Sequence, residues 1–306
     1  MSKPRISNRQ IEAFMRVAES NSFTGAAQRM RLTNSAISSL IAELENAVGA
    51  RLFDRSTRRV VLNENGRQFL PSALSFMRTL REVERMAETL GDQSADTIRV
   101  AAPLVIASAI LPPIIAEFQA SHPNSEVHIL DTGVEWLGDR VATGEADLAV
   151  GPDQSTDETV KAESLLPSKW VVWLSPEHPL AKKDMLRWRD LKGVQFHTGG
   201  HDHERIMEQA MAGLDPSERV VPGPVLDNIS TALGLAAAGV GVTLCPAYVE
   251  PLAKAFRLEM RRLIDPEFTR YVMLYSPSNR SISGTVTEFS DLLRKRFKEL
   301  EPSPDS

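Results

Sequence analysis

Three of the six histidines of this 306-residue chain fall within seven residues. The run reads His197-Thr-Gly-Gly-His201-Asp-His203-Glu204. Imidazole and carboxylate groups bind metals, and histidine titrates near neutral pH, so the run indicates a metal site or a pH-sensitive ligand contact. Its spacing matches no closed zinc pattern, and a polar loop before a helix explains the same residue types. We predict no metal and no cofactor, and leave the ligand contact and the polar loop open.

Charge is divided unevenly along the chain. Residues 1–66 contain ten Lys and Arg and six Asp and Glu, which gives +4; because the whole chain has a net charge of −5, residues 67–306 carry −9. Such asymmetry is typical of an N-terminal module that binds a polyanion. A basic run, Arg51-Leu-Phe-Asp-Arg55-Ser-Thr-Arg58-Arg59, lies near the end of this segment.

Apolar residues at helical spacing predict three short helices before residue 50. The first covers residues 6–20, the second follows Ser22 and reaches Met30, and the third is capped by Thr33 and ends at Gly49. The turn between the second and third helices is only two residues long. Two helices joined in this way predict a helix-turn-helix.

The second helix of such a motif lies in the DNA major groove. Opposite its apolar stripe, the predicted third helix carries short polar side chains that reach base edges or phosphates. The following segment, 51–62, reads as a hairpin with a basic tip, which predicts a winged helix-turn-helix that contacts phosphates or the minor groove. A solvated basic loop on an unrelated helical bundle is the alternative. The predicted DNA-contacting residues are Thr33, Asn34, Ser35, Ser38, Ser39, Arg51, Arg55, Arg58 and Arg59.

A long helix is predicted next, because Asn63 can cap a helix that begins at Glu64. Apolar residues recur at alternating gaps of four and three from Phe69 to Leu90. This heptad seam predicts a dimerisation helix, with packing along its own domain as the alternative. Pro71 removes one backbone donor and predicts a kink. The polar run 91–96 then predicts a hinge.

From residue 97, strand and helix patterns alternate, which predicts a parallel sheet with helices on both faces. About 200 residues of such units predict two subdomains with a ligand crevice beyond the strand ends. The predicted strands are 98–101, 127–130, 147–150, 170–174, 194–197, 242–245 and 271–275. The predicted helices are 107–120, 136–143, 202–211, 228–238 and 285–300.

Residues 11–66 resemble the DNA-binding domain of LysR-type transcriptional regulators. The matching residues are Phe14, Ser22-Phe23-Thr24-x-Ala26-Ala27, Ala36-Ile37-Ser38, Leu44-Glu45, Gly49, Leu52-Phe53-x-Arg55 and Gly66. Asn34 and Leu40 stand where the family usually has Gln, and Ser39 where it has Arg. Asn63 replaces a usual Thr. These departures predict an unusual operator sequence and fewer phosphate contacts.

The remaining chain resembles the effector domain of the same family. The matching residues are Leu111-Pro112, Gly144-Glu-Ala-Asp147-Leu-Ala, Pro176-Glu-His178-Pro179-Leu180-Ala, and Ala237-Ala-Gly239-Val-Gly241-Val with Pro246. The resemblance implies a periplasmic-binding-protein-like α/β fold, with subdomain I at 97–165 and 268–306 and subdomain II at 166–267. The effector residues carried over by position are Ala102, Pro103, Leu104, Val134, His197, Thr198, Asn228 and Thr243. Family members often have Ser or Thr at 102–104, so the apolar corner here suggests a partly hydrophobic ligand.

We therefore expect a winged helix-turn-helix DNA-binding domain at 1–62, a linker helix at 63–92 and an effector-binding domain at 97–306. The protein is expected to be a cytoplasmic LysR-type regulator of transcription that binds double-stranded operator DNA and a small-molecule effector. It would pair through the linker helix as a homodimer, associate into a homotetramer and be able to contact the transcription machinery, with no membrane partner. The alternatives are a small-molecule sensor without a DNA role and an α/β enzyme that uses the same cleft. No nucleophile-elbow motif supports the enzyme.

Overall fold

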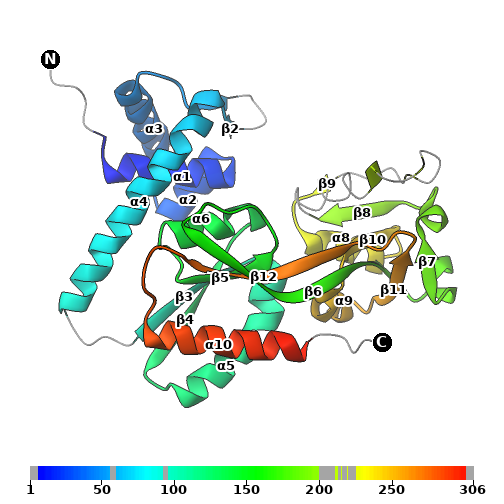
Figure 1. Ribbon diagram of the computed structural model, residues 1–306. Coiled ribbons are helices and arrows are strands. Elements are labelled where there is room, and N and C mark those ends of the chain that lie inside the picture. Colours follow the sequence, from blue (N-terminus) through cyan, green and yellow to red (C-terminus); the bar gives the residue numbers. More distant parts are fainter. Residues whose placement is uncertain are drawn as a thin grey trace. The chain divides into compact units, whose positions relative to one another are not determined.

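The computed structural model describes residues 6–55, 60–91, 96–199, 211–212, 215, 219 and 225–300 (Figure 1). The chain divides into two compact units. The first unit contains the residues up to 94 together with the segment 139–146, and the second contains the rest. Within the described part of the chain, no helix combines the length and apolar character that a membrane span requires.

The first unit begins with α1 (Asn8–Ser20), α2 (Phe23–Met30) and α3 (Asn34–Val48). Local chemistry sets where α2 and α3 start, because the hydroxyls of Ser22 and Thr33 each accept a hydrogen bond of 3.2 Å, from the backbone N–H groups of Gly25 and Ala36. Gly49 ends α3 with φ of 81°, in the left-handed region. The predicted caps of these two helices are confirmed.

The three helices share one apolar core. Ala26 and Ala27 are buried on α2, and their small side chains let the neighbouring helices approach closely. Ile37, Ile41 and Leu44 of α3 are completely buried. The predicted inward stripe of the third helix is confirmed, and its opposite face is left outward.

A short hairpin follows, made of β1 (Phe53–Arg55) and β2 (Val60–Leu62) in antiparallel register. Phe53 anchors it, since its ring lies 5.4 Å from the ring of Phe14 between centroids. The predicted hairpin is confirmed. Its tip, residues 56–59, lies outside the described residues.

The long helix α4 (Glu64–Gly91) leaves the hairpin directly. Asn63 caps it, because its Oδ1 accepts the backbone N–H of Gly66 at 2.9 Å. A Cβ at Gly66 would lie 2.1 Å from the carbonyl oxygen of Leu52, so only glycine allows this close approach. The predicted cap and start of this helix are confirmed, and Pro71 lies within its first turns as expected.

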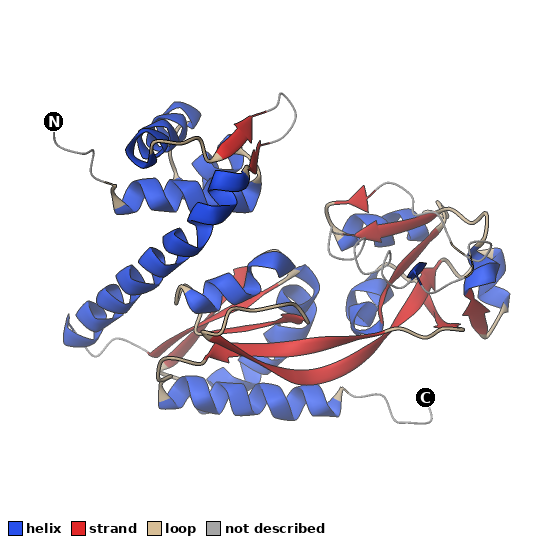
Figure 2. Ribbon diagram, turned by 45° about the horizontal axis from the view of Figure 1, so that its top comes forward, coloured by secondary structure: helices blue, strands red, loops and turns tan. Residues whose placement is uncertain are grey.

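The second unit is built on a mixed sheet of ten described strands in the order β4-β3-β5-β12-β6-β10-β8-β9, with β11 pairing with β6 and β7. Their bounds are β3 (Asp96–Ala102), β4 (Ser125–Asp131), β5 (Leu148–Pro152), β6 (Val160–Leu174), β7 (Met185–Arg187), β8 (Phe196–Gly199), β9 (Val225–Leu226), β10 (Val242–Pro246), β11 (Glu259–Ile264) and β12 (Thr269–Pro277). Figure 2 shows β6 and β12 as the long strands that continue from one half of the sheet into the other.

The predicted parallel sheet is a mixed sheet in the structure. β3 is parallel to β4 and β5, as expected, but β12 is antiparallel to β5 and β6. The reason is topological: β6 leaves the first half of the sheet and β12 returns to it, so these neighbours run in opposite directions. The predicted strand 170–174 is only the last third of β6.

Helices cover both halves of the sheet. Their bounds are η1 (Ile106–Ile110, a π-helix), α5 (Leu111–Ser121), η2 (Val134–Trp136), α6 (Leu137–Ala142), η3 (Pro179–Lys182), η4 (Trp188–Leu191), α8 (Ile229–Ala237), η5 (Ala247–Val249), α9 (Glu250–Ala255) and α10 (Gly284–Glu299). The predicted helix 107–120 is thus a π-turn followed by an α-helix, and that at 136–143 begins with a 3-10 turn. The predicted helix 202–211 and the hinge lie almost entirely outside the described residues.

Candidate DNA-binding and effector sites

A surface of short polar side chains lies at the start of α3. Thr33, Asn34, Ser35 and Ser39 are exposed, and Ser38 is half-buried. No acidic residue stands in the first turn of this helix, so its positive end faces solvent without a competing carboxylate. Hydroxyl and amide groups at a helix N-terminus suit phosphate oxygens and base edges.

One contact of this surface was not foreseen from the sequence. The side-chain amide Nδ2 of Asn34 donates to Oγ1 of Thr24 at 3.1 Å, which ties the recognition helix to α2. This bond orients the amide, so Asn34 presents its oxygen while its nitrogen is partly occupied. Thr24 belongs to the family-like run at the start of α2, but that run does not show that its hydroxyl faces Asn34.

Two of the predicted arginines are among the described residues of the first unit. Arg51 is exposed, and its carbonyl oxygen accepts hydrogen bonds from the side-chain amides of Asn63 and Asn65 at 3.0 and 3.2 Å. Arg55 is the last residue of β1. Arg58 and Arg59 lie outside the described residues, so their predicted DNA contacts stay predictions.

The first group of predicted effector residues lies where β3 ends. Ala102 is completely buried, and its carbonyl oxygen accepts the backbone N–H of Thr132 at 3.1 Å. Pro103 and Leu104 are half-buried, and the carbonyl oxygen of Pro103 accepts the N–H of Ala107 at 2.9 Å as the helical turn begins. Val134, the first residue of η2, is also half-buried.

The second group lies around β8, β10 and α8. His197 Nε2 donates to the carbonyl oxygen of Val240 at 2.8 Å, and Thr243 Oγ1 donates to that of Ala232 at 2.8 Å. Both side chains are buried, so these bonds fasten the strands to α8 and its C-terminal turn. Nε2 of His197 and Oγ1 of Thr243 are therefore already engaged.

Two members of this group keep polar groups unengaged. Thr198 is completely buried, and among the described residues its Oγ1 has no hydrogen-bond partner. Asn228 is exposed at the N-cap of α8 and makes no side-chain bond to the helix. A buried hydroxyl without a partner is costly, so Thr198 is the polar group here most in need of one.

The structure brings the two groups together at α8. A Cβ on Gly199 would lie 2.4 Å from the Cα of Ile229, so the end of β8 touches the first turn of α8. Leu104 packs against the apolar cluster that contains Ile229 and Val171. The corner after β3 therefore adjoins the N-terminus of α8 across this cluster.

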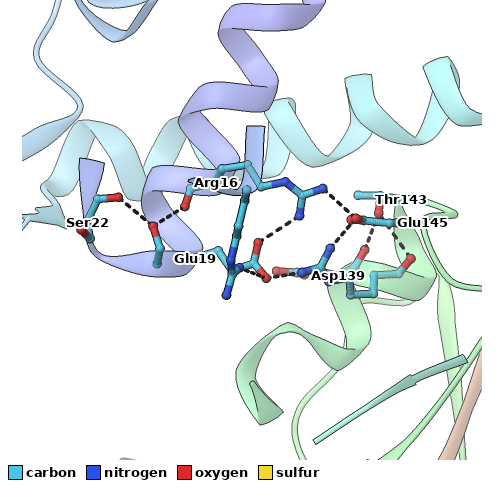
Figure 3. Close-up of polar contacts among 9 residues, drawn as sticks. Arg16, Glu19, Ser22, Asp139, Thr143 and Glu145 are labelled. Carbon is cyan, nitrogen blue, oxygen red and sulfur yellow. Dashed lines mark hydrogen bonds and ion pairs between the residues drawn. The ribbon is translucent and has the colours of Figure 1, made fainter. Parts of the chain in front are cut away.

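An ion-pair cluster in the first unit was also not foreseen. Figure 3 shows Arg16 and Glu19 of α1 facing Glu145 of the segment 139–146. Arg16 pairs with Glu145 at 2.8 Å and with Glu19 at 3.1 Å. Arg29 reaches Glu19 at 2.7 Å, and Arg140 contacts both carboxylates. Arg16 and Glu19 are three residues apart on α1, but Arg16 and Glu145 are 129 residues apart, so no local pattern predicts the whole cluster.

The opposite charges in this cluster shift the pKa values of Glu145 and Arg16. Burial works to raise the pKa of Glu145, but Arg140 and Arg16 lower it below the ordinary glutamate value. Burial likewise works against the charged form of Arg16, and Glu145 and Glu19 outweigh it and raise its pKa. Glu145 and Arg16 are therefore both ionised at neutral pH.

Among the described residues, no three or more His, Cys, Asp or Glu side chains are grouped so that they could hold a metal ion. His201 and His203 are not among these residues, so the absence says nothing of them.

Both parts of the chain match known protein families. Residues 91–298 match the family described as "LysR substrate binding domain", and residues 8–67 match "Bacterial regulatory helix-turn-helix protein, lysR family". The first match alone covers more than half of the chain. The chain belongs to the LysR family of transcriptional regulators. It is therefore a LysR-type regulator with a DNA-binding helix-turn-helix and an effector-binding α/β domain.

Similar regulators span almost the whole chain. The RuBisCO operon transcriptional regulator of Allochromatium vinosum is 31% identical over 93% of this chain and 95% of its own length. The transcriptional dual regulator GltC of Bacillus subtilis is 27% identical over 96% of this chain and 98% of its own. These relatives are regulators, which sets aside the enzyme and the sensor without a DNA role.

The solved structure of full-length CbnR complexed with its target DNA has the same fold. It covers 95% of this LysR regulator and 99% of its own chain, with a TM-score of 0.54 and 18% identity. This likeness supports the predicted architecture of a helix-turn-helix head and an α/β domain.

Proposed function

We propose that this LysR regulator binds a two-fold symmetric operator through a pair of winged heads, with the first turn of α3 in the major groove. The observation that carries the proposal is the exposed polar start of α3, in a unit that also contains the hairpin of β1 and β2. In this proposal Asn34, Ser35, Ser38 and Ser39 read base edges or phosphates. Thr33 and the wing arginines Arg51, Arg55, Arg58 and Arg59 contact the backbone.

The linker helix α4 supports pairing of two chains. Phe76 is 43% exposed and Val83 is 61% exposed, although both belong to the apolar seam. Within the described first unit, this part of the seam is left uncovered. A heptad stripe exposed in one chain is buried by the same stripe of a second chain. We assign residues 63–92 to this dimerisation helix, 1–62 to the DNA-binding domain and 97–306 to the effector domain.

The effector is proposed to bind between subdomain I (97–165 and 268–306) and subdomain II (166–267). The apolar corner Ala102-Pro103-Leu104, with Val134, faces the hydrophobic part of the ligand. Thr198 and Asn228 supply hydrogen bonds, and His197 and Thr243 hold the strand ends in place. The ligand binds one arrangement of the subdomains more tightly than the other. Only this difference in affinity allows the ligand to change DNA binding.

Further association of the effector domains into a homotetramer completes the proposal. The protein acts in the cytoplasm, where operator DNA lies, and contact with the transcription machinery would follow from its place on a promoter. Sedimentation of the full chain tests the assembly. The expected result is a tetramer that dissociates into dimers on dilution, and a monomer at every concentration would contradict it.

Effector binding is tested by Thr198→Val, which keeps the size of the side chain and removes its hydroxyl. A metabolite that raises the unfolding temperature of the wild-type protein is found first by screening. Thr198→Val is expected to weaken binding of that metabolite about tenfold, because one buried hydrogen bond is lost. Equal affinity of the two proteins for the metabolite would show that Thr198 does not contact it.

A further inference from the structure

A cavity lies in the effector domain, apart from the predicted effector residues. Its volume is about 810 Å³, which is within the range of small-molecule sites. One wall comes from α5 and the end of α10, and the other from η5, α9 and β11. The strands β6 and β12 contribute the residues between these walls. None of the eight predicted effector residues lines this groove.

The floor of the groove is apolar. Ile110, Ile114, Leu166 and Val171 line it and are buried. Tyr248 lies among them, and its backbone N–H donates to Ser168 Oγ at 2.9 Å, which fixes its place. A ligand that covers this floor removes apolar surface from water.

The rim adds exposed apolar side chains. Met260 is 40% exposed and Leu300 is 51% exposed, on opposite walls of the groove. Side chains of this size at the mouth of an apolar hollow are typical of a binding surface rather than of a solvated one. The occupant therefore has a hydrophobic body that these two residues can cover.

Positive charge where β6 meets the β11 wall determines the sign of the occupant's charge. Lys169 Nζ and Arg262 Nη2 both contact the one carboxylate of Glu267, at 2.7 and 2.9 Å. Two cations thus share one anion, which leaves a surplus of one positive charge. Arginine has five donors and lysine three, so a second carboxylate can be bound beside Glu267.

The opposite wall has the reverse arrangement. Arg296 pairs with Glu117 at 2.6 Å and with Glu299 at 2.5 Å, so one cation serves two carboxylates. Lys295 also acts on Glu117, so this wall carries no surplus of positive charge. An anionic group is therefore attracted to Lys169 and Arg262 rather than to this wall, which orients an anionic ligand.

We propose that this groove binds a small amphipathic carboxylate, with its hydrophobic body over Ile114, Leu166 and Tyr248 and its carboxylate at Lys169 and Arg262. The site is separate from the effector cleft of the proposed function. It contacts both subdomains and the strands that join them, so its occupant favours one arrangement of the two. Binding itself requires neither DNA nor the effector.

The test is calorimetric titration of the full chain with decanoate and, separately, with decylamine. Decanoate is expected to bind at least about tenfold more tightly, because it alone gains charge-assisted hydrogen bonds at the β11 wall. The double variant Lys169→Gln, Arg262→Gln is expected to lose this preference. Lys161→Gln is the control, since Lys161 is exposed on β6, the strand that also carries Lys169, and does not line the groove.

A second pair of variants tests the place of binding. Thr269→Trp fills the groove from β12 and is expected to abolish decanoate binding, whereas Tyr271→Trp, exposed on the same strand outside the groove, leaves it unchanged. Equal unfolding temperatures verify that both variants fold.

Two results would overturn the proposal. If decanoate binds the Thr269→Trp variant and the double variant as tightly as it binds the wild-type protein, it occupies another site. Absence of decanoate binding, together with a sedimentation change in Thr269→Trp alone, would make the groove an interface between copies of this chain. Measurement of DNA binding by the same proteins tests the proposed regulator function separately.

Discussion

At the residue scale, Asn34 shows what sequence can and cannot provide. Its place at the exposed start of the recognition helix was predicted from helical spacing, and the structure agrees. Its bond to Thr24 was not, because the bond joins side chains ten residues apart on two helices. Similarly, His197 and Thr243 were recognised as polar residues near strand ends, but their bonds to Val240 and to Ala232 of α8 depend on tertiary packing.

Asn34→Ala is expected to change which DNA sequences are bound, with a cost of about 1 to 3 kcal/mol on the preferred site and little on random DNA. The physical reason is the loss of a base-edge contact, while phosphate contacts stay. Thr24→Ala, which only frees the amide, is expected to have a smaller effect in the same direction. Fluorescence anisotropy on preferred and random duplexes measures both. An equal loss on the two duplexes would exclude base reading by Asn34.

Arg55→Ala is expected to weaken binding severalfold on all sequences and to lower the salt slope of binding by about one, because one phosphate contact is lost. Arg58→Ala is expected to behave the same way. Arg189→Ala, an exposed arginine of the second unit, is the control. Unchanged affinity and salt slope in both wing variants would refute the wing assignment.

At the element scale, short-range rules predicted helix ends better than strand directions. Ser22, Thr33, Gly49 and Asn63 act through bonds within a few residues, so their roles can be read from sequence. The direction of β12 depends on the path of the chain through the whole sheet. Alternating strand and helix patterns contain no information on that path.

Phe76→Glu on α4 is expected to lower the affinity between paired chains at least tenfold, because it places a charge in the apolar seam. Thr79→Glu, exposed on the same helix and outside the seam, should leave the affinity nearly unchanged. Sedimentation equilibrium measures both. If Phe76→Glu assembles like wild type, α4 is not the pairing helix.

Glu145→Gln is expected to reduce the free energy of unfolding by about 1 to 2 kcal/mol at pH 7, since it leaves Arg140 and Arg16 with less negative charge. The folded pKa of Glu145 is lowered by these arginines, so its contribution is present above the ordinary glutamate pKa of 4.5 and is lost as pH falls through the lowered value. Urea titrations followed by circular dichroism should therefore show the two proteins converging in acid. A constant difference down to pH 3 would contradict this account, and Glu177→Gln is the exposed control.

At the scale of the whole molecule, the charge split first seen in the sequence has a structural counterpart. The basic N-terminal segment folds as a winged helix-turn-helix with an exposed polar surface, and the acidic remainder contains the α/β domain with the groove and the residues that we propose bind the effector. Composition alone left a sensor and an enzyme open. Family membership decided between them, because no single side chain in the cleft does so.

The most direct test of the central claim is selection of bound sequences from randomised duplex DNA by the full chain at two salt concentrations, followed by sequencing. The account predicts enrichment of one site with two-fold symmetry, with half-sites about one helical turn or a multiple of it apart, and weaker binding at higher salt. Absence of any enriched site, with binding that does not depend on salt, would contradict operator recognition by these winged heads.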